Sequence, residues 1–429
     1  MDMVILFGTM IVLFAIGVPI GICLIAPCFL VLAVNPVTSA SFLAQSFYTG
    51  VASSSMIALP FFMICGNIMD KGGISKRLVA AANNLIGGIT GSLGMVAILA
   101  CMFFGAVSGS AVATVAAIGA IMIPEMVRNG YDKYYATGLC AVAGGLGIIV
   151  PPSYPMVIYG VTNNESIGDL FIAGIVPAIL VGAMLMVVNY LYAKKKGLKG
   201  DNKFNGKKAL KGLWDAKWAL LMPLIILGGI YSGIFTATEA SVVATVYGII
   251  VGVFVYKEVT FKQLWDEFKA TATFSGGMMW TVAPATAIGL MFVYMGVNKA
   301  ISNFFLGIST NMYVVMLLIT IILFFIGMFM QTTPAIVIFS PILLNVAKAV
   351  GISPLQFGVV MTLALAVGFC TPPVCANIFV AQSMTGLPMD KIVKPAIPFI
   401  GVLIICLLLV SFFPFLSTGL LGILNSLSG

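Results

Sequence analysis

The chain has 429 residues, of which 61% are hydrophobic and 8% are charged, and its formal net charge is +8. Soluble domains carry roughly 25% charged residues, so this composition excludes a soluble globular protein and indicates a polytopic membrane protein. The basic residues cluster in short segments between apolar stretches, which indicates orientation in a bilayer and argues against nucleic-acid binding.

The apolar stretches lack the residues that carry most acid–base and metal chemistry. The chain has no histidine, and its eight cysteines are scattered without a C-x-x-C spacing. The thirteen Asp and Glu residues lie in loops or at the ends of apolar stretches, so none is placed for a proton relay. We therefore expect no enzyme activity and no cofactor.

The first half of the chain, residues 1–193, contains a hairpin and a broken helix. Residues 3–34 are apolar around a break at 17–19 and cross the membrane either twice or once; they lack the positive start of a signal peptide. An apolar block over 48–69 and an amphipathic interfacial segment over 75–84 follow. The stretch 89–127 is too long for one span, which predicts a re-entrant helical hairpin with Ser108-Gly-Ser110 at its tip. A broken helix over 134–163 and a span over 171–193 complete this half.

A Lys-rich segment over 194–217 separates this half from residues 218–429, which repeat the same plan. Two crossings, a basic interfacial segment and a further span are expected at 218–235, 238–256, 257–269 and 272–297. A second hairpin over 311–350 carries Gln331-Thr-Thr-Pro334 at its tip. A second broken helix over 355–386 and a last span over 395–414 follow.

Each half contains one Pro-Pro pair inside an apolar stretch, at 151–152 and at 372–373. A helix placed there must break, because proline has no N–H and clashes with the preceding turn. In a membrane, the carbonyls freed by such a break are tolerated only where protein or a water-filled cavity satisfies them. Two broken helices in corresponding places of two halves indicate the binding site of a transporter.

The spacing around these pairs indicates an internal duplication. Gly130 precedes the first pair by the same number of residues as Gly351 precedes the second pair. Ser110 likewise precedes the first Pro-Pro pair by the same number of residues as Gln331 precedes the second. Two shared offsets in a chain with few prolines favour a genuine repeat over coincidence.

The number of crossings between the two hairpins predicts how the repeats are oriented. Five predicted segments separate the hairpins, and an odd number makes the hairpins enter from opposite faces. With residues 194–217 in the cytoplasm, 19 of the 21 basic residues are cytoplasmic, and Lys299 and Lys348 are the exceptions. This distribution satisfies the positive-inside rule and therefore predicts two inverted repeats.

The hairpin tips and helix breaks offer neutral oxygen atoms instead of charges. Unwound carbonyls together with hydroxyl oxygens form a cage that suits Na⁺, and the N-termini of half-helices suit an anionic group. Taken singly, each small residue here is better explained by close helix packing than by a binding role. The combination of a tip with a Pro-Pro break, present twice, favours a binding site built from Ser108, Gly109, Ser110, Gln331, Thr332, Thr333, Gly145, Gly147, Gly368 and Thr371.

Five motifs follow one another along essentially the whole chain: 55-SMIALPFFMICG-66, 108-SGSAVA-113, 150-VPPS-153 with 158-IYG-160, 235-FTATEA-240 and 371-TPPV-374. Together they resemble the large membrane (M) subunit of TRAP transporters, the tripartite ATP-independent periplasmic carriers. This resemblance implies a Na⁺-driven elevator carrier with an ion-transporter-like fold in the bacterial inner membrane. It also implies two partners: a small four-helix membrane subunit (Q) on a separate chain and a soluble periplasmic protein that delivers an acidic substrate.

The resemblance also implies two sodium sites, formed largely by main-chain oxygens, with the substrate between them. Site 1 would use Ser108, Gly109, Ser110, Gly147, Val150 and Pro152. Site 2 would use Thr332, Thr333, Gly368, Thr371 and Pro373. The expected polar contacts of the substrate are Ser153, Tyr154 and Asn377.

This sequence departs from the family pattern at several of these places. Asn67, Thr114 and Gln331 stand where many relatives have an acid, and Cys375 replaces a common glycine. Side-chain coordination at these positions is therefore in doubt, whereas main-chain coordination is not. The cargo stays open among C4-dicarboxylates, sugar acids such as sialic acid and other carboxylates. A channel with a carbonyl-lined filter remains the alternative function.

Overall fold

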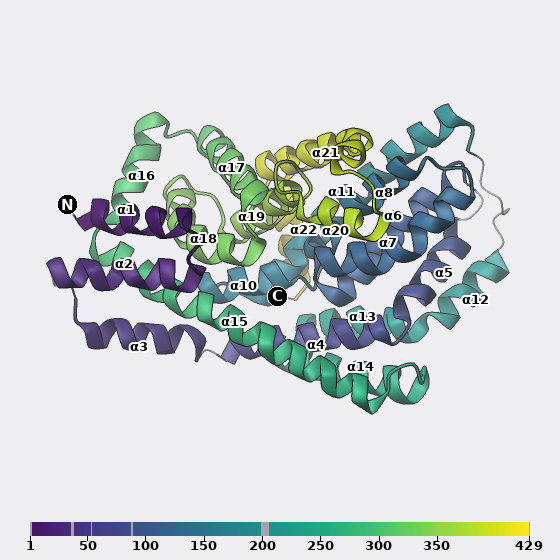
Figure 1. Cartoon of the computed structure of the whole chain (residues 1–429), viewed down its shortest axis with the longest axis horizontal. Coiled ribbons are helices and arrows are strands. Elements are labelled where there is room, and N and C mark those ends of the chain that lie inside the picture. The colour runs from purple at the N-terminus through teal and green to yellow at the C-terminus, as the bar shows by residue number, and fades with distance from the viewer. Residues whose placement is uncertain (1, 36–37, 53, 87–88, 199–205, 429) are drawn as a thin grey trace.

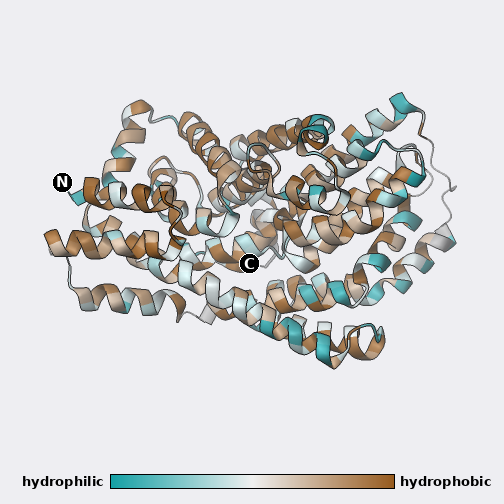
Figure 2. Ribbon diagram, viewed as in Figure 1, coloured by the Kyte–Doolittle hydropathy of each residue, from teal (hydrophilic) through white to brown (hydrophobic). Residues whose placement is uncertain are grey.

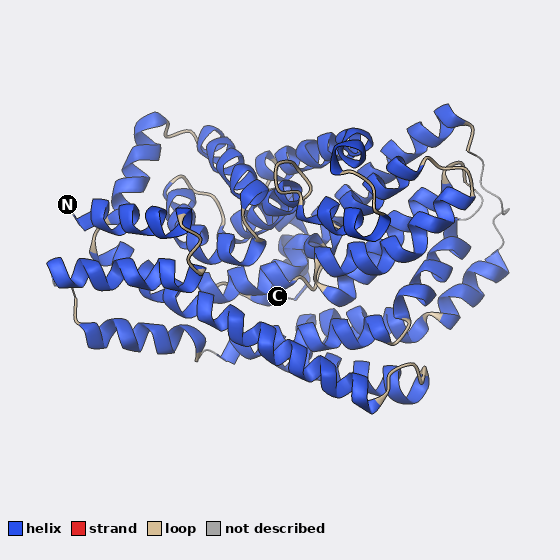
Figure 3. Cartoon of the chain, viewed as in Figure 1, coloured by secondary structure: helices blue, strands red, loops and turns tan. Residues whose placement is uncertain are grey.

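The chain folds into helices joined by short connections (Figures 1 and 3). The computed structural model describes residues 2–35, 38–52, 54–86, 89–198 and 206–428, and this part of the chain contains no strand. Eight helices within it are long and apolar enough to cross a membrane. Hydrophilic residues gather at the end of the molecule that carries α12 (Gly206–Asp215), as Figure 2 shows.

The N-terminal helices pack against one long helix, α15 (Phe261–Tyr294), which would be about 51 Å long at 1.5 Å per residue. Residues 3–34 form two antiparallel helices, and Gly17 with φ +79° lies in the turn between them (Figure 1). α15 packs along the second, third and fourth helices of the chain. The four N-terminal helices are α1 (Asp2–Ala15), α2 (Ile20–Val34), α3 (Ala40–Val51) and α4 (Ala58–Lys71), and a 3₁₀ turn precedes α4.

The structure divides the apolar block 48–69 between two helices, because α3 ends at Val51 and α4 begins at Ala58. One prediction for this part of the chain was wrong: the segments 257–269 and 272–297 are not separate, because α15 runs through both. A capping box between Thr260 and Gln263 starts α15, and no glycine or proline interrupts its first four turns.

The first hairpin consists of α6 (Ser92–Ser108) and α7 (Ala111–Arg128), with Gly109 and Ser110 at its tip. Gly109 has φ +60°, a left-handed conformation that glycine adopts without strain, and this reverses the chain between the helices. The broken helix that follows comprises α8 (Lys133–Ala143), α9 (Leu146–Ile149) and α10 (Tyr154–Asn163). The sequence predicted these two units over 89–127 and 134–163.

The second hairpin and broken helix have the same construction. The hairpin consists of α17 (Met312–Phe329) and α18 (Thr332–Ala349), and the broken helix of α19 (Pro354–Phe369) and α20 (Ala376–Thr385). The hairpins lie on opposite sides of the molecular centre: α6 and α7 extend toward the α12 end, and α17 and α18 toward the end that carries α1 (Figure 1). These features confirm the predicted fold class, an all-α polytopic membrane protein with two inverted repeats.

A single constant shift along the sequence relates many features of the two halves. This shift, the repeat shift, brings Pro151 onto Pro372, and it also brings Gly130 (φ +86°) onto Gly351 (φ +82°). In each half a hairpin glycine packs on a glycine of the broken helix. A methyl group on Gly105 would lie 2.8 Å from the Gly147 Cα, and one on Gly368 would lie 2.7 Å from the Gly327 Cα. The limits of the repeats, 1–193 and 218–429, stay a prediction.

The remaining helices connect and surround these units. The sequence did not predict α16 and α22, which are short helices before the second hairpin and at the C-terminal end. α12 lies in the Lys-rich segment, part of which is outside the described residues. The other helices are α5 (Ile74–Ile86), α11 (Ile167–Lys196), α13 (Lys217–Tyr231), α14 (Ala237–Ile249) with a π-helical end (Ile250–Val255), α16 (Val297–Ile308), α21 (Met389–Phe412) and α22 (Phe415–Ser428).

Candidate functional site

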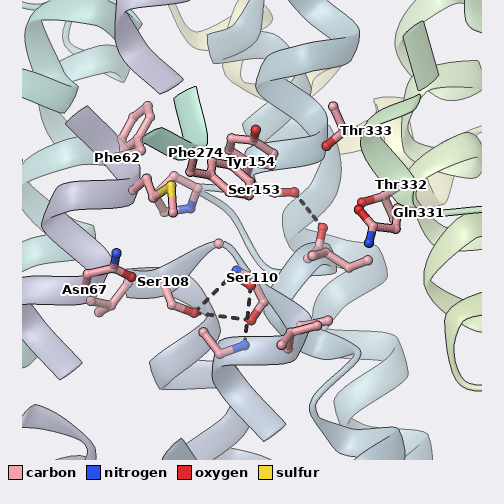
Figure 4. A pocket seen from close by; sticks show the side chains of 18 of the residues that line it. Phe62, Asn67, Ser108, Ser110, Ser153, Tyr154, Phe274, Gln331, Thr332 and Thr333 are labelled. Atoms are coloured by element: carbon pink, nitrogen blue, oxygen red, sulfur yellow. Dashed lines mark hydrogen bonds between the residues drawn. The ribbon is translucent and has the colours of Figure 1, made fainter. Parts of the chain in front are cut away.

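A cavity of about 310 Å³ lies where the two hairpin tips meet the first helix break (Figure 4). Its walls come from both hairpins, the first broken helix, the end of α19 at Phe369 and the helices α4 and α15. None of the residues that line it is an Asp, Glu, Lys, Arg or His. Its polar lining residues are Asn67, Ser108, Ser110, Ser153, Tyr154, Gln331, Thr332 and Thr333.

Three helix N-termini converge on this cavity. The N-cap residues of α7, α10 and α18 are Ser110, Ser153 and Gln331, and all three line the cavity. The first turn of a helix has unpaired N–H groups and a partial positive charge, and it therefore attracts anions. No side chain caps α10 or α18, so their first N–H groups remain available to a ligand. The cavity is thus suited to an anion without containing a charged side chain.

A cluster of oxygen atoms lies beside the first helix break. The Thr114 hydroxyl donates to the Ser110 carbonyl (2.7 Å) and lies 3.2 Å from the Ser108 hydroxyl. Gly147 packs directly on this cluster, since a methyl group on it would lie 2.5 Å from the Ser110 carbonyl oxygen and would also collide with the Thr114 hydroxyl. These residues form the first cage.

The prolines leave carbonyls at the first break without their usual helical partners. The Gly147 and Ile148 carbonyls would accept from residues 151 and 152, which are prolines without N–H groups. The Ser153 hydroxyl donates to the Ile148 carbonyl at 2.5 Å instead. The Gly147 carbonyl therefore has no N–H group to accept from at position 151, and Gly147 lies beside the hydroxyls and the Ser110 carbonyl.

The second break is built differently and is more exposed. The Thr371 hydroxyl donates to the Val367 carbonyl (2.7 Å), within its own helix, and the Thr371 N–H donates to the Gly368 carbonyl (2.9 Å). The segment after Thr371 is exposed, and half of the Val374 side chain is accessible to solvent. Thr332 and Thr333, at the tip of the second hairpin, line the cavity, as does Phe369 at the end of α19, just before the break. We call these residues of tip and break the second cage.

Comparison with known proteins identifies the family. Residues 7–416 match the family described as "Tripartite ATP-independent periplasmic transporter, DctM component". The chain belongs to the DctM family. This confirms the resemblance to the large TRAP subunit that the motifs indicated.

Three similar DctM proteins carry different substrate names. An isethionate TRAP transporter permease protein, DctMQ, from Oleidesulfovibrio alaskensis is 39% identical over 96% of this chain, which spans 65% of that relative's length. A C4-dicarboxylate large permease protein, DctM, from Pseudomonas aeruginosa is 37% identical over 85% of this chain and 86% of its own. A sialic acid large permease protein, SiaM, from Vibrio cholerae is 37% identical over 95% of this chain and 96% of its own.

A solved structure has the same fold at low sequence identity. The crystal structure of the Alcanivorax borkumensis YdaH transporter, described as having an unusual topology, aligns with a TM-score of 0.64. The alignment covers 88% of each chain at 13% identity, so it bears on the fold alone.

The structure places most of the predicted site residues of this DctM protein at or beside the cavity. Gly147 lies behind the first tip, on Ser110. Val150 caps the end of α9 and is outside the cavity lining, as are Gly368, Thr371 and Pro373. The predicted residues that line the cavity are Ser108, Gly109, Ser110, Pro152, Ser153, Tyr154, Thr332 and Thr333.

The expectation that Asn377 contacts the substrate does not fit this structure. Asn377 is fully buried away from the cavity, and its amide nitrogen donates to the Cys370 sulfur at 3.4 Å. Cys375, just before it, has φ +47°, and this left-handed turn starts α20. Asn377 therefore lies inside the packed helices and not in the wall of the cavity.

Sequence reasoning missed several cavity residues. Phe62 and Asn67 on α4 and Phe274 on α15 line the cavity, but they belong to helices that are distant in sequence from the tips. Gly66 gave a partial signal, since it belongs to a family motif. A methyl group on Gly66 would lie 2.9 Å from the Ser108 Cα, so α4 contacts the first tip directly.

Tyr154 connects the first break to α15. Its hydroxyl contacts the Met278 sulfur of that helix, and its ring lies beside Phe274, with the ring centroids 6.3 Å apart. Thr333, at the tip of the second hairpin, lines the same cavity (Figure 4).

Proposed function

We propose that this DctM protein is the membrane carrier subunit that imports a small organic anion, driven by Na⁺, across the bacterial inner membrane. The observation that carries the proposal is the convergence of three helix N-termini on a cavity without charged side chains. Buried polar groups require hydrogen-bond partners, and the uncapped N–H groups of α10 and α18 supply donors for a carboxylate or sulfonate.

The chemistry of the two cages supports sodium as the coupling ion. Their donor atoms are hydroxyl and carbonyl oxygens, which are the ligands that hard cations prefer. The described residues contain no group of three His, Cys, Asp or Glu side chains that could hold a metal ion of another kind. In the proposed carrier, both sodium ions and the anion bind near the tips, and the hairpins with their broken helices move past α4 and α15 as one elevator unit.

The name of one relative supports a small membrane partner. This chain spans 65% of the DctMQ protein, whose name joins the letters M and Q. We infer that the remainder of that relative corresponds to the Q subunit and that a Q subunit associates with the DctM fold of this chain. The family description includes the word periplasmic, and we infer that a soluble binding protein delivers the anion from that compartment.

The substrate is an organic anion of the kind named for the relatives. The volume of about 310 Å³ is at the lower end of the range of about 300–1,000 Å³ for small-molecule sites. Isethionate, a C4-dicarboxylate such as succinate, and sialic acid are therefore the first compounds to test.

The decisive experiment measures uptake into liposomes that contain this chain together with the membrane and periplasmic proteins encoded beside it. Labelled isethionate, succinate and sialic acid serve as probes, and Na⁺ is replaced by K⁺ or choline in the controls. We expect one probe to be taken up saturably and only with an inward Na⁺ gradient. Equal uptake without Na⁺ would refute sodium coupling, and a continuous non-saturating conductance would support the channel.

A further inference from the structure

We infer that the two cages load in a fixed order: the first cage binds Na⁺ before the substrate arrives, and the second becomes complete only with the substrate. This inference rests on the proposed sodium coupling. It follows from a difference between the two halves of the chain, which the repeat shift otherwise relates.

The first cage is already assembled. The Ser108 and Thr114 hydroxyls and the Ser110 carbonyl are linked by hydrogen bonds of 2.7–3.5 Å, and Thr114 is fully buried. The break beside it, Pro151 to Ser153, is buried too. A cation that enters this cage meets oxygen atoms already in place, so little ordering cost opposes its binding.

The second cage lacks this arrangement. The repeat shift places Phe329, Gln331 and Ala335 where the first cage has Ser108, Ser110 and Thr114. The Thr371 hydroxyl donates to the Val367 carbonyl of its own helix, and among the described residues no hydrogen bond joins it to Thr332 or Thr333 at the hairpin tip. The corresponding break residues, Pro372 to Val374, are exposed.

The second hairpin already packs on its break through Gly327 and Gly368, so completing the second cage requires the Thr332 and Thr333 hydroxyls to turn toward Thr371. Thr332 and Thr333 line the anion cavity, so an anion that binds the N-terminus of α18 acts on the same tip. Ordering this tip lowers the remaining cost of binding the second ion, which gives positive coupling between the anion and that ion. The first cage does not depend on this movement.

Two matched substitutions separate the cages. Thr114→Val and Thr371→Val each replace a hydroxyl by a methyl group, one in each cage. The readout without substrate is the thermal unfolding of the purified chain as a function of Na⁺, with choline keeping the ionic strength constant. Binding to the folded state alone raises the unfolding temperature.

In the absence of substrate, we expect Thr114→Val to require about 5- to 150-fold more Na⁺ for the same stabilisation, as expected for the loss of one buried ligand. Thr114→Ser keeps the hydroxyl and should stay close to the wild type. Thr371→Val should leave this substrate-free curve unchanged, yet shift the Na⁺ dependence of uptake to higher concentration. If Thr114→Val does not fold, Ser108→Ala tests the same cage.

Each outcome has a definite meaning. An equal shift of the substrate-free curve in Thr371→Val and Thr114→Val would overturn the fixed order. An unchanged curve in Thr114→Val, with wild-type uptake still dependent on Na⁺, would overturn it as well and leave the proposed function intact. Wild-type uptake that needs no Na⁺ would instead refute the proposed sodium coupling.

Discussion

The contact between Gly147 and the first hairpin tip allows a sharp test of main-chain coordination. A methyl group at this position would lie 2.5 Å from the Ser110 carbonyl oxygen, so Gly147→Ala would force the tip to move by about 0.9 Å to reach an ordinary contact of 3.4 Å. Overpacking of this kind costs about 1–3 kcal/mol. If that cost falls on the ion-bound geometry, Na⁺ affinity decreases by about 5- to 150-fold.

The assay is the Na⁺ dependence of thermal unfolding, followed by the Na⁺ dependence of uptake with the substrate that proves active. Gly401→Ala is the matched control, because a methyl group on Gly401 of α21 meets nothing within 4 Å. We expect the control to keep the wild-type Na⁺ dependence and Gly147→Ala to lose affinity at unchanged expression. A wild-type Na⁺ dependence in Gly147→Ala would show that this tip and break do not form an ion site.

Three further predictions concern topology, stability and the cavity. Cysteines introduced at the exposed positions Lys211 and Lys299 should differ in labelling by an impermeant thiol reagent on intact cells. Only the cysteine at 299 should react, and the eight native cysteines are buried. Labelling at 211 would overturn the orientation. Asn189→Leu should destabilise the fold by about 1–3 kcal/mol in chemical unfolding, because Asn189 is fully buried and donates to the Gly91 carbonyl at 2.8 Å; an unchanged midpoint would contradict this. Asn67→Ala should change the apparent affinity for the anion and leave the Na⁺ dependence of uptake unaltered, since Asn67 lines the cavity outside both cages. A shifted Na⁺ dependence in this variant would mean that Asn67 binds the ion.

Local chain chemistry made the tips and breaks predictable from the sequence. A Pro-Pro pair must interrupt a helix wherever the rest of the fold places it, and Ser108-Gly-Ser110 can end one helix and start another. The side chains that close the cavity have no such signal. Phe274 belongs to a helix of 34 residues, and only the packing of α15 decides which of its faces meets the tips.

Asn377 shows the limit of reasoning from position along the chain. It follows the second break as Ser153 and Tyr154 follow the first, so a location in the cavity was a fair expectation. Yet the left-handed conformation of Cys375 redirects the chain, and Asn377 is buried against Cys370. Its position along the chain does not reveal this burial, which depends on the backbone conformation between the break and α20.

The absence of charged side chains from the cavity lining has a consequence for the proposed transport cycle. A charge held in a low-dielectric interior costs several kcal/mol unless an opposite charge compensates it. Because Asn67 and Gln331 are neutral amides, the empty cavity contains no side-chain charge, and the empty carrier can return without carrying one. A bound anion needs a cation beside it, and a sodium ion already bound in the first cage opposes movement of the carrier until the anion compensates its charge. Within the proposed function, coupling between Na⁺ and the anion therefore follows from the neutral lining. A cavity that holds only one of the two carries an uncompensated charge. The empty cavity carries no side-chain charge, and in the loaded cavity the charges of Na⁺ and the anion offset each other.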